Sequence, residues 1–256
     1  GVAVRFVPDR PTTLEQRLTF ARARAAVRSN KPFQRLVVAF FLNSLANGFP
    51  ITLFLLFVQH NLRASATMLS WILGAYFVMA LVSVPFWLLL TKRYGKHRVW
   101  VAAMILVCCF FIWVPFLGEG DAMWLLIISL FTGFGLGADL VLPPAMQADV
   151  VDLDELRHRE KRTGIFFAVW SIALKLSLAL AAGIAFPILE LVDFQRDVGD
   201  NLPGALLTLA ILYAIVPVIF KLAAIALIWG FPLTAAKQAQ IRRLIAAKDR
   251  RRIASG

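Results

Sequence analysis

The chain has 256 residues, of which 60% are apolar and only 16% carry a charge, and its formal net charge is +12. A soluble domain is nearer ~45–50% apolar and ~25% charged, so this composition argues against a soluble enzyme or binding domain and predicts an integral membrane protein. The positive charges lie in the tails and in alternate loops, which indicates orientation in a membrane rather than a surface that binds nucleic acid.

The first 35 residues are polar and basic and are predicted to be a cytoplasmic linker. A helix start is expected at Thr12, which has capping-box spacing to Glu15. Apolar residues then recur every three or four positions, which predicts either an amphipathic helix on the membrane surface or a solvated linker helix. Residue 1 is Gly rather than Met, so we expect a processed or excerpted piece.

Six apolar runs follow, each with about the ~20 residues needed to cross ~30 Å of hydrocarbon. They predict an all-α membrane fold, a six-transmembrane-helix bundle over residues 36–231, and a basic cytoplasmic tail over residues 232–256. The predicted spans are about 36–58, 68–90, 99–117, 123–146, 165–191 and 206–231.

Prolines suggest where these helices are interrupted. Pro50 lies in the middle of the first span, so that helix is predicted to be kinked or locally unwound. The pair Pro143-Pro144 lies near the end of the fourth span, and a loop rich in both charges is predicted to follow it.

The charge distribution predicts the orientation. The N-terminal segment holds eight Lys and Arg residues, the second–third loop four, the fourth–fifth loop four and the C-terminal tail seven, whereas the other side has only Arg63 and Arg196. By the positive-inside rule, both termini are predicted to be cytoplasmic.

Ionisable residues inside the apolar runs are costly, by roughly 2.5–3.5 kcal/mol each on insertion scales. Lys175 lies eleven residues beyond Gly164, hence ~16 Å from the cytoplasmic edge and near the midplane. Asp139 lies seven residues before Met146, hence ~10 Å from the same edge. The two residues are predicted either to line a water-filled cavity or to form a structural ion pair across facing helices. Lys221 is predicted to be structural, because nothing in the sequence clusters with it.

One helical face of ~140° carries a set of side chains suited to a ligand. These are Trp170, Ser171, Leu174 and Lys175. An aromatic plate, a hydroxyl and a cation suit a sugar ring or a polar head group; the alternative is that Trp170 only packs. Asn43 and Asn47 also share a face, and they either hydrogen-bond between helices or line the substrate path.

Two acids, Asp149 and Asp152, share a helix face at the predicted cytoplasmic mouth. Either they pair with basic residues of another helix when the mouth closes, or they are solvated loop charges. The three histidines lie in loops or at span ends, and no nucleophile–base grouping is predicted, so no enzyme, metal site or bound cofactor is expected. The adjacent Cys108 and Cys109 are expected to pack as small apolar residues.

Several short motifs occur in a fixed order along the chain. They are Asn30-Lys31-Pro32-Phe33, Lys92-Arg93-Tyr94-Gly95-Lys96, Ala148-Asp149-Val150-Val151-Asp152, Arg162-Thr163-Gly164 and the lysine of the fifth span. Together they resemble the C-terminal half of a major facilitator transporter, and more narrowly the glycoside–pentoside–hexuronide:cation symporters. The resemblance covers nearly the whole chain from Asn30 onward.

This resemblance implies that the six spans are helices seven to twelve of a twelve-helix transporter, with residues 1–35 joining the two halves. It implies cation-coupled symport of a sugar or glycoside by alternating access in the plasma membrane. Arg162 would act with the two loop acids as a gate. The coupling cation, Na⁺, Li⁺ or H⁺, would be bound mainly by acids of an N-terminal six-helix half, which is the expected partner besides the lipid bilayer and the substrate.

Two departures and two alternatives qualify the sugar prediction. Trp170 and Ser171 stand where the family's best-known member has an amide and a threonine, and Leu140 lies near the position of a tenth-helix aromatic. The same fold group includes sodium-dependent lysophospholipid symporters, so a lipid-like substrate is an alternative. The other alternative is a non-transporting six-span subunit or scaffold.

Overall fold

The computed structural model describes residues 20–158, 162–196 and 201–232. In these segments the chain forms helices and no strands, and six helices are long and apolar enough to cross a membrane, so the predicted all-α, six-span fold is confirmed. The elements are α1 (Phe20–Ser29), α2 (Lys31–Leu56), η2 (Phe57–Asn61), α3 (Ala66–Tyr94), α4 (Lys96–Phe111), η3 (Val114–Phe116), α5 (Ala122–His158), α6 (Thr163–Leu191), α7 (Pro203–Ala210), η4 (Ile211–Ile215) and α8 (Val216–Ile228).

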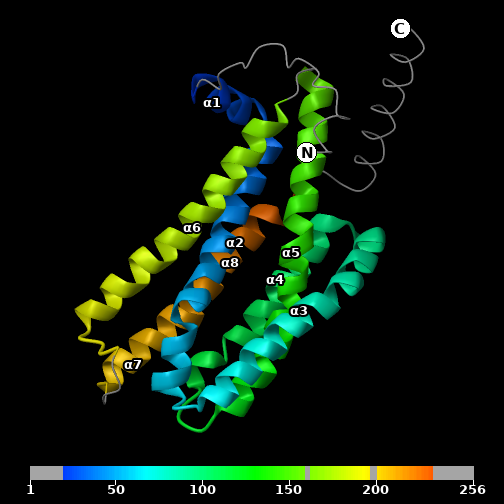
Figure 1. Cartoon of the computed structure of the whole chain (residues 1–256). Helices are drawn as coiled ribbons and strands as arrows, with labels where there is room; N and C mark the ends of the chain where they lie inside the picture. Colours follow the sequence, from blue (N-terminus) through cyan, green and yellow to red (C-terminus); the bar gives the residue numbers. More distant parts are fainter. Residues whose placement is uncertain (1–19, 159–161, 197–200, 233–256) are drawn as a thin grey trace, which may run out of the picture.

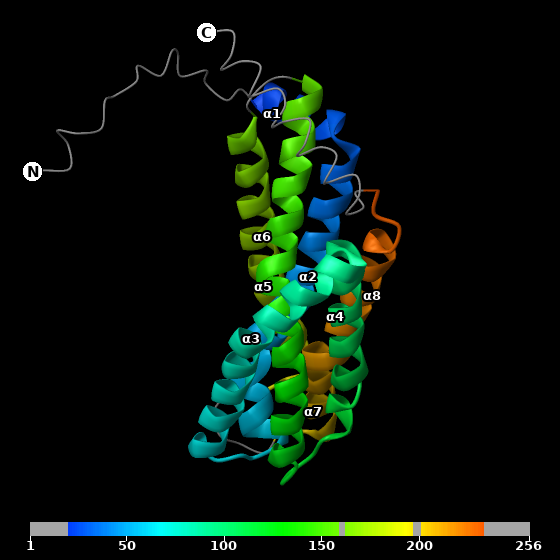
Figure 2. The same cartoon turned by 90° about the vertical axis from the view of Figure 1, so that its right-hand side faces the viewer.

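The six spans run along a common long axis (Figure 2). Helix α2 packs between α6 and α8, and α5 packs against α3 and α4, as Figure 1 shows. Contacts of α4 with α8, and of α2 with α5, join the two groups. The interior therefore lies where α2, α4, α5 and α8 meet, and α3 and α6 flank it.

Three glycines let α5 approach its neighbours closely. A Cβ added at Gly133 would lie 2.3 Å from the carbonyl oxygen of Tyr76 on α3, and one at Gly137 would lie 2.0 Å from Oγ of Ser83. Gly135 faces α4 instead, where an added Cβ would lie 2.4 Å from Val107. Small residues at helix interfaces allow backbones to come together, and here they fix the position of the α5 segment that carries Asp139.

The start of α2 is fastened to two other helices. Asn30 caps α2 by accepting a hydrogen bond from the backbone N–H of Phe33, and its amide donates to Asp154 of α5. One turn later, Arg35 donates hydrogen bonds to the carbonyl oxygens of Leu227 and Gly230, just at and beyond the end of α8. A cation at a helix C-terminus complements the helix dipole. We call this end of the bundle the basic end.

Three prolines, at two places, do not interrupt the helices as expected. Of the two alternatives predicted at Pro50, a kink or a local unwinding, the unwinding is wrong, because α2 continues through this residue to Leu56. The predicted loop after Pro143-Pro144 is also mostly wrong, because α5 continues to His158. Each proline leaves one carbonyl without its helical donor, and membrane helices tolerate this loss when neighbouring groups compensate.

The last span contains the interruption that the sequence did not predict. It is built from α7, a π-helical turn η4 and α8, and a second π-helical turn, η2, ends the first span. The rings of Phe57 in η2 and Tyr213 in η4 stack with centroids 4.5 Å apart. The two wide turns therefore support each other.

The surface is that of a membrane protein. On α3 the apolar side chains of Trp71, Leu81 and Val82 are each about two-thirds exposed. At the end away from the basic end, Trp113 and Trp124 are also exposed, a position typical of aromatic residues at a membrane–water boundary. The helix start expected at Thr12 and the tail beyond residue 232 lie outside the described residues.

Candidate transport site

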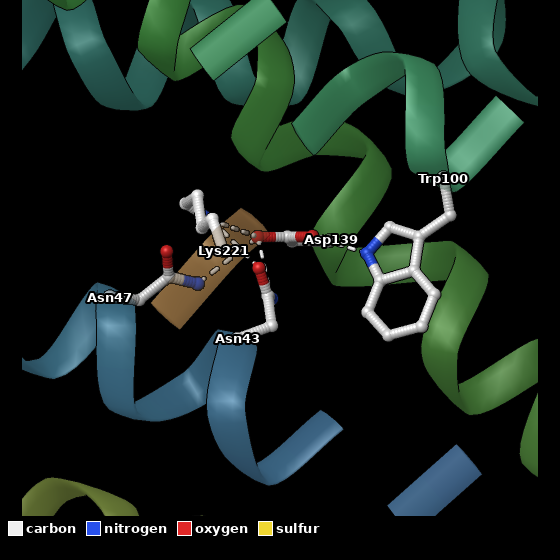
Figure 3. A network of polar contacts seen from close by, with 5 residues as sticks. All are labelled: Asn43, Asn47, Trp100, Asp139 and Lys221. Carbon is white, nitrogen blue, oxygen red and sulfur yellow. Dashed lines mark hydrogen bonds and ion pairs between the residues drawn. The ribbon is translucent and has the colours of Figure 1, made fainter. Parts of the chain in front are cut away.

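A carboxylate inside the bundle accepts three hydrogen bonds and forms one ion pair, with partners from three other helices (Figure 3). Oδ2 of Asp139, on α5, accepts hydrogen bonds from the side-chain amides of Asn43 at 3.1 Å and Asn47 at 3.0 Å. Its Oδ1 accepts one from the indole N–H of Trp100 at 2.6 Å. Nζ of Lys221, on α8, lies 3.6 Å from Oδ2 and donates a hydrogen bond to Oδ1 of Asn43 at 2.7 Å.

This ion pair is almost fully removed from solvent in the isolated chain. The side chains of Lys221 and Asp139 are 4% and 10% exposed. A buried ion pair persists only when further hydrogen bonds satisfy its partners, and the amides and the indole supply them here. We call these five residues, Asn43, Asn47, Trp100, Asp139 and Lys221, the Asp139 network.

Helical geometry explains why these residues meet. Asn43 and Asn47 are four residues apart and therefore share the face of α2 that is turned towards α5 and α8. Asp139 is seventeen residues from the start of α5, and Lys221 is eighteen residues from the start of α7. Both helices start at the same end of the bundle, so both residues lie ~26 Å along it.

A cavity of about 300 Å³ adjoins the network and extends from it away from the basic end. Polar side chains line its interior: Asn47, Tyr76, Ser129, Thr132, Asp139, Tyr213 and Lys221. Its exposed lining residues are apolar and belong to α2 and α3, namely Ile51, Leu73 and Phe77. The cavity therefore has an apolar mouth between these two helices and an ion pair at its inner end.

The predicted pairing of Asp139 with Lys175 is not formed. Lys175 lies on α6, which packs against a different face of α2, and its side chain is exposed and has no hydrogen bond or ion pair to any described residue. Lys221 was predicted to be structural because nothing in the sequence clusters with it, but in the structure it has partners: it contacts both Asp139 and Asn43. The sequence did contain a signal for this pair: the matched distances of the two residues from their helix starts.

The four residues predicted to share a ligand-binding face of α6 separate in the structure. Trp170 is buried, and its ring stacks on that of Phe40 on α2 with centroids 3.7 Å apart. The side chains of Ser171, Leu174 and Lys175 are exposed. These three residues do not line the cavity described above.

The two acids predicted to gate the basic end lie on α5 rather than in a loop. Asp149, on α5, is buried and forms an ion pair with Lys96 at the start of α4. Asp152 lies one turn further along α5, and Arg162 immediately precedes α6. Among the described residues, no three His, Cys, Asp or Glu side chains are grouped as a metal site would require.

A six-span helical bundle that holds a buried ion pair beside an intramembrane cavity has the features of a membrane transport protein. The chain matches the family described as MFS/sugar transport protein over residues 3–235. It belongs to this family of membrane transporters.

Curated relatives agree with this assignment. The chain is 25% identical to sodium-dependent lysophosphatidylcholine symporter 1 of Xenopus tropicalis over 233 residues, which cover 90% of this chain and 44% of the relative. It is 31% identical to an uncharacterized symporter of Synechocystis over 51% of this chain and 25% of the relative. It is 23% identical to the sphingosine-1-phosphate transporter MFSD2B of Xenopus tropicalis over 79% of this chain and 39% of the relative. The chain thus spans less than half the length of these relatives.

Proposed function

We propose that this chain is the C-terminal half of a cation-coupled secondary transporter that carries an amphipathic solute by alternating access. The observation that carries the proposal is the position of the Asp139–Lys221 ion pair at the inner end of a cavity with an apolar mouth. Such a cavity offers charge to the head of an amphiphile and apolar surface to its tail. Relatives named as symporters and transporters of lysophosphatidylcholine and sphingosine-1-phosphate support this solute class.

The predicted sugar or glycoside substrate is a second candidate. It is favoured by the hydroxyl and amide side chains in the cavity, among them Asn47, Ser129 and Thr132, which resemble the polar groups that recognise sugar hydroxyls. The narrower assignment to the glycoside–pentoside–hexuronide:cation symporters remains a prediction. The same holds for the choice of Na⁺, Li⁺ or H⁺, the plasma-membrane location and the cytoplasmic termini.

The test is uptake by the complete reading frame that contains this chain, reconstituted in proteoliposomes. Labelled lysophosphatidylcholine and a labelled galactoside are offered separately with an imposed sodium or proton gradient. We expect gradient-dependent accumulation of the lysophospholipid, whereas accumulation of the galactoside alone would establish the sugar alternative. Folded protein that accumulates neither solute would contradict the proposal and favour a scaffold.

A matched pair of variants ties this activity to the cavity. Asn47→Leu removes a donor to Asp139 and places apolar bulk in the cavity, so uptake should fall at least about tenfold, as expected for the loss of ~1.4 kcal/mol or more of binding. Ser70→Leu places the same apolar side chain on the exposed surface of α3, away from the cavity, and should leave uptake unchanged. Equal uptake by the two variants would separate the cavity from transport.

A further inference from the structure

The two members of the ion pair are held unequally. Without Lys221, Asp139 would still accept three hydrogen bonds, from Asn43, Asn47 and Trp100. Lys221 has one acceptor at hydrogen-bond distance among the described residues, Oδ1 of Asn43, and its 3.6 Å separation from Asp139 is too long for a hydrogen bond. An ammonium group has three donors. Lys221 is therefore the partner with unused hydrogen-bonding capacity, and it lines the cavity.

An anionic group that entered the cavity would use this capacity. A carboxylate or phosphate oxygen at Lys221 would accept the donors that Asp139 and Asn43 leave unused, in a charge-assisted hydrogen bond. The ion pair is neutral as it stands, so the added anion would leave the network with one uncompensated negative charge. Such a charge is costly in a buried site, and a cation that binds at Asp139 removes the cost.

We propose that Lys221 exchanges Asp139 for an anionic group of the transported solute, and that Asp139 takes up one monovalent cation at the same time. The inference rests on the proposed function and deepens it, because it gives the solute an anionic group and places a coupling site within this half of the transporter. Binding of the solute and binding of the cation then strengthen each other equally, as linkage requires.

The surroundings of Asp139 suit either a proton or a sodium ion. A proton needs only the carboxylate. A sodium ion needs oxygen ligands, and when Lys221 leaves, Oδ1 of Asn43 becomes available beside the carboxylate and the Asn47 side chain. The other titratable groups around the pair among the described residues are Tyr76 from α3, Cys108 from α4 and Tyr213 from η4. These groups are ordinarily neutral at pH 7, so none of them supplies the missing charge.

The test measures binding to the complete reading frame in lipid nanodiscs. The probe is oleoyl lysophosphatidylglycerol, whose phosphodiester carries one negative charge throughout the pH range used, and the control ligand is monoolein, which has the same acyl chain and no charge. We expect the affinity for the anionic probe to rise about tenfold for each tenfold rise in cation concentration below saturation. Dependence on Na⁺ at fixed pH identifies sodium, and dependence on pH without Na⁺ identifies the proton. Monoolein should respond to neither.

Variants locate the cation at Asp139 rather than elsewhere in the protein. Asp139→Asn replaces the carboxylate with an uncharged amide, so no bound cation is needed to neutralise this position. The variant should therefore bind the anionic probe tightly, and its affinity should not depend on the cation concentration. If this variant does not fold, the double variant Asp139→Asn/Lys221→Gln removes both charges together, and it should lose both the preference for the anionic probe and the cation dependence.

The inference would be overturned if the affinity of whichever of these variants folds still rose with cation concentration as steeply as that of the wild type. It would also be overturned if the affinities for the anionic probe and for monoolein depended equally on the cation. Gradient-driven uptake that survives either result would leave the transporter proposal intact. Failure of uptake itself would instead contradict the proposed function.

Discussion

Asp139 is held by two amides, an indole and an ammonium group. These partners differ in how much stability the protein would lose without them. The indole of Trp100 donates the shortest of the hydrogen bonds, at 2.6 Å, and its ring is fully buried. Hydrogen bonds to charged groups contribute more to stability than those between neutral groups, about 1.5–3 kcal/mol against ~1 kcal/mol. Trp100 is therefore expected to stabilise the bundle as well as to position the carboxylate.

Trp100→Phe should lower the thermal unfolding temperature of the purified protein, because it keeps an aromatic ring but removes the donor to a buried carboxylate. The matched control is Trp87→Phe, since the indole of Trp87 donates to the neutral backbone carbonyl of Phe134 at 2.7 Å. Melting in detergent, followed by loss of the monodisperse elution peak, should show the larger drop for Trp100. Equal drops would mean that the charge of Asp139 does not strengthen its bond to the indole.

Individual residues of the network were predicted unequally well from the sequence. Asp139 stood out because an acid in an apolar run needs partners, and the two asparagines stood out by their four-residue spacing. The choice between Lys175 and Lys221 was different, because it depends on which helix packs against which face of α2 and α5. Periodicity within one helix carries no such information. Lys175, the lysine nearer the midplane, was therefore predicted as the partner of Asp139, and the structure pairs Lys221 with it instead.

Among the elements, α5 depends most on close packing. Gly137→Ala would place a Cβ 2.0 Å from Oγ of Ser83 and 2.5 Å from the carbonyl oxygen of Ala80, so α3 and α5 must move apart. We expect a marked loss of folded protein, measured as the monodisperse fraction after extraction and as the unfolding temperature.

Gly183→Ala is the control for helix propensity, because an added Cβ there meets nothing within 4 Å. This change should be neutral or stabilising by up to ~1 kcal/mol, the difference in propensity between Gly and Ala. A Gly137 variant as stable as the Gly183 variant would show that the α3–α5 spacing is more adaptable than these distances indicate.

Hydropathy was sufficient to predict the existence of six spans, because each helix must bury its backbone hydrogen bonds within itself in lipid. It was insufficient to predict interruptions. Prolines were expected to interrupt the helices at Pro50 and after Pro143-Pro144, where the helices continue. The π-helical turns at Phe57–Asn61 and Ile211–Ile215 have no amino-acid composition that would distinguish them from the α-helices around them. Tertiary packing decides these features.

At the scale of the whole molecule, the charge asymmetry predicts that the basic end faces the cytoplasm. Cysteines are introduced at Arg93, on an exposed position of the basic end, and at Glu119, whose exposed side chain forms an ion pair with Arg63 at the other end. The background has all native cysteines replaced by alanine. In intact cells a membrane-impermeant maleimide should label Glu119→Cys and leave Arg93→Cys unlabelled until the membrane is opened. The reverse pattern would contradict the positive-inside prediction.

The π-helical turn at Ile211–Ile215 makes the last span tolerant of one change that preserves the reading frame of the gene. A π turn accommodates one residue more than an α turn, so deletion of a single codon there would let the last span close into a continuous α-helix. Because the lost residue is the extra one that the wide turn absorbs, α8 would keep its orientation relative to α7, and Lys221 would stay on the face that holds Asp139. The same deletion between Val216 and Phe220 would fall in a regular α-helical segment and would turn Lys221 away by about 100°. A gap at the turn in an alignment is therefore compatible with the ion pair, whereas a gap just beyond it is not.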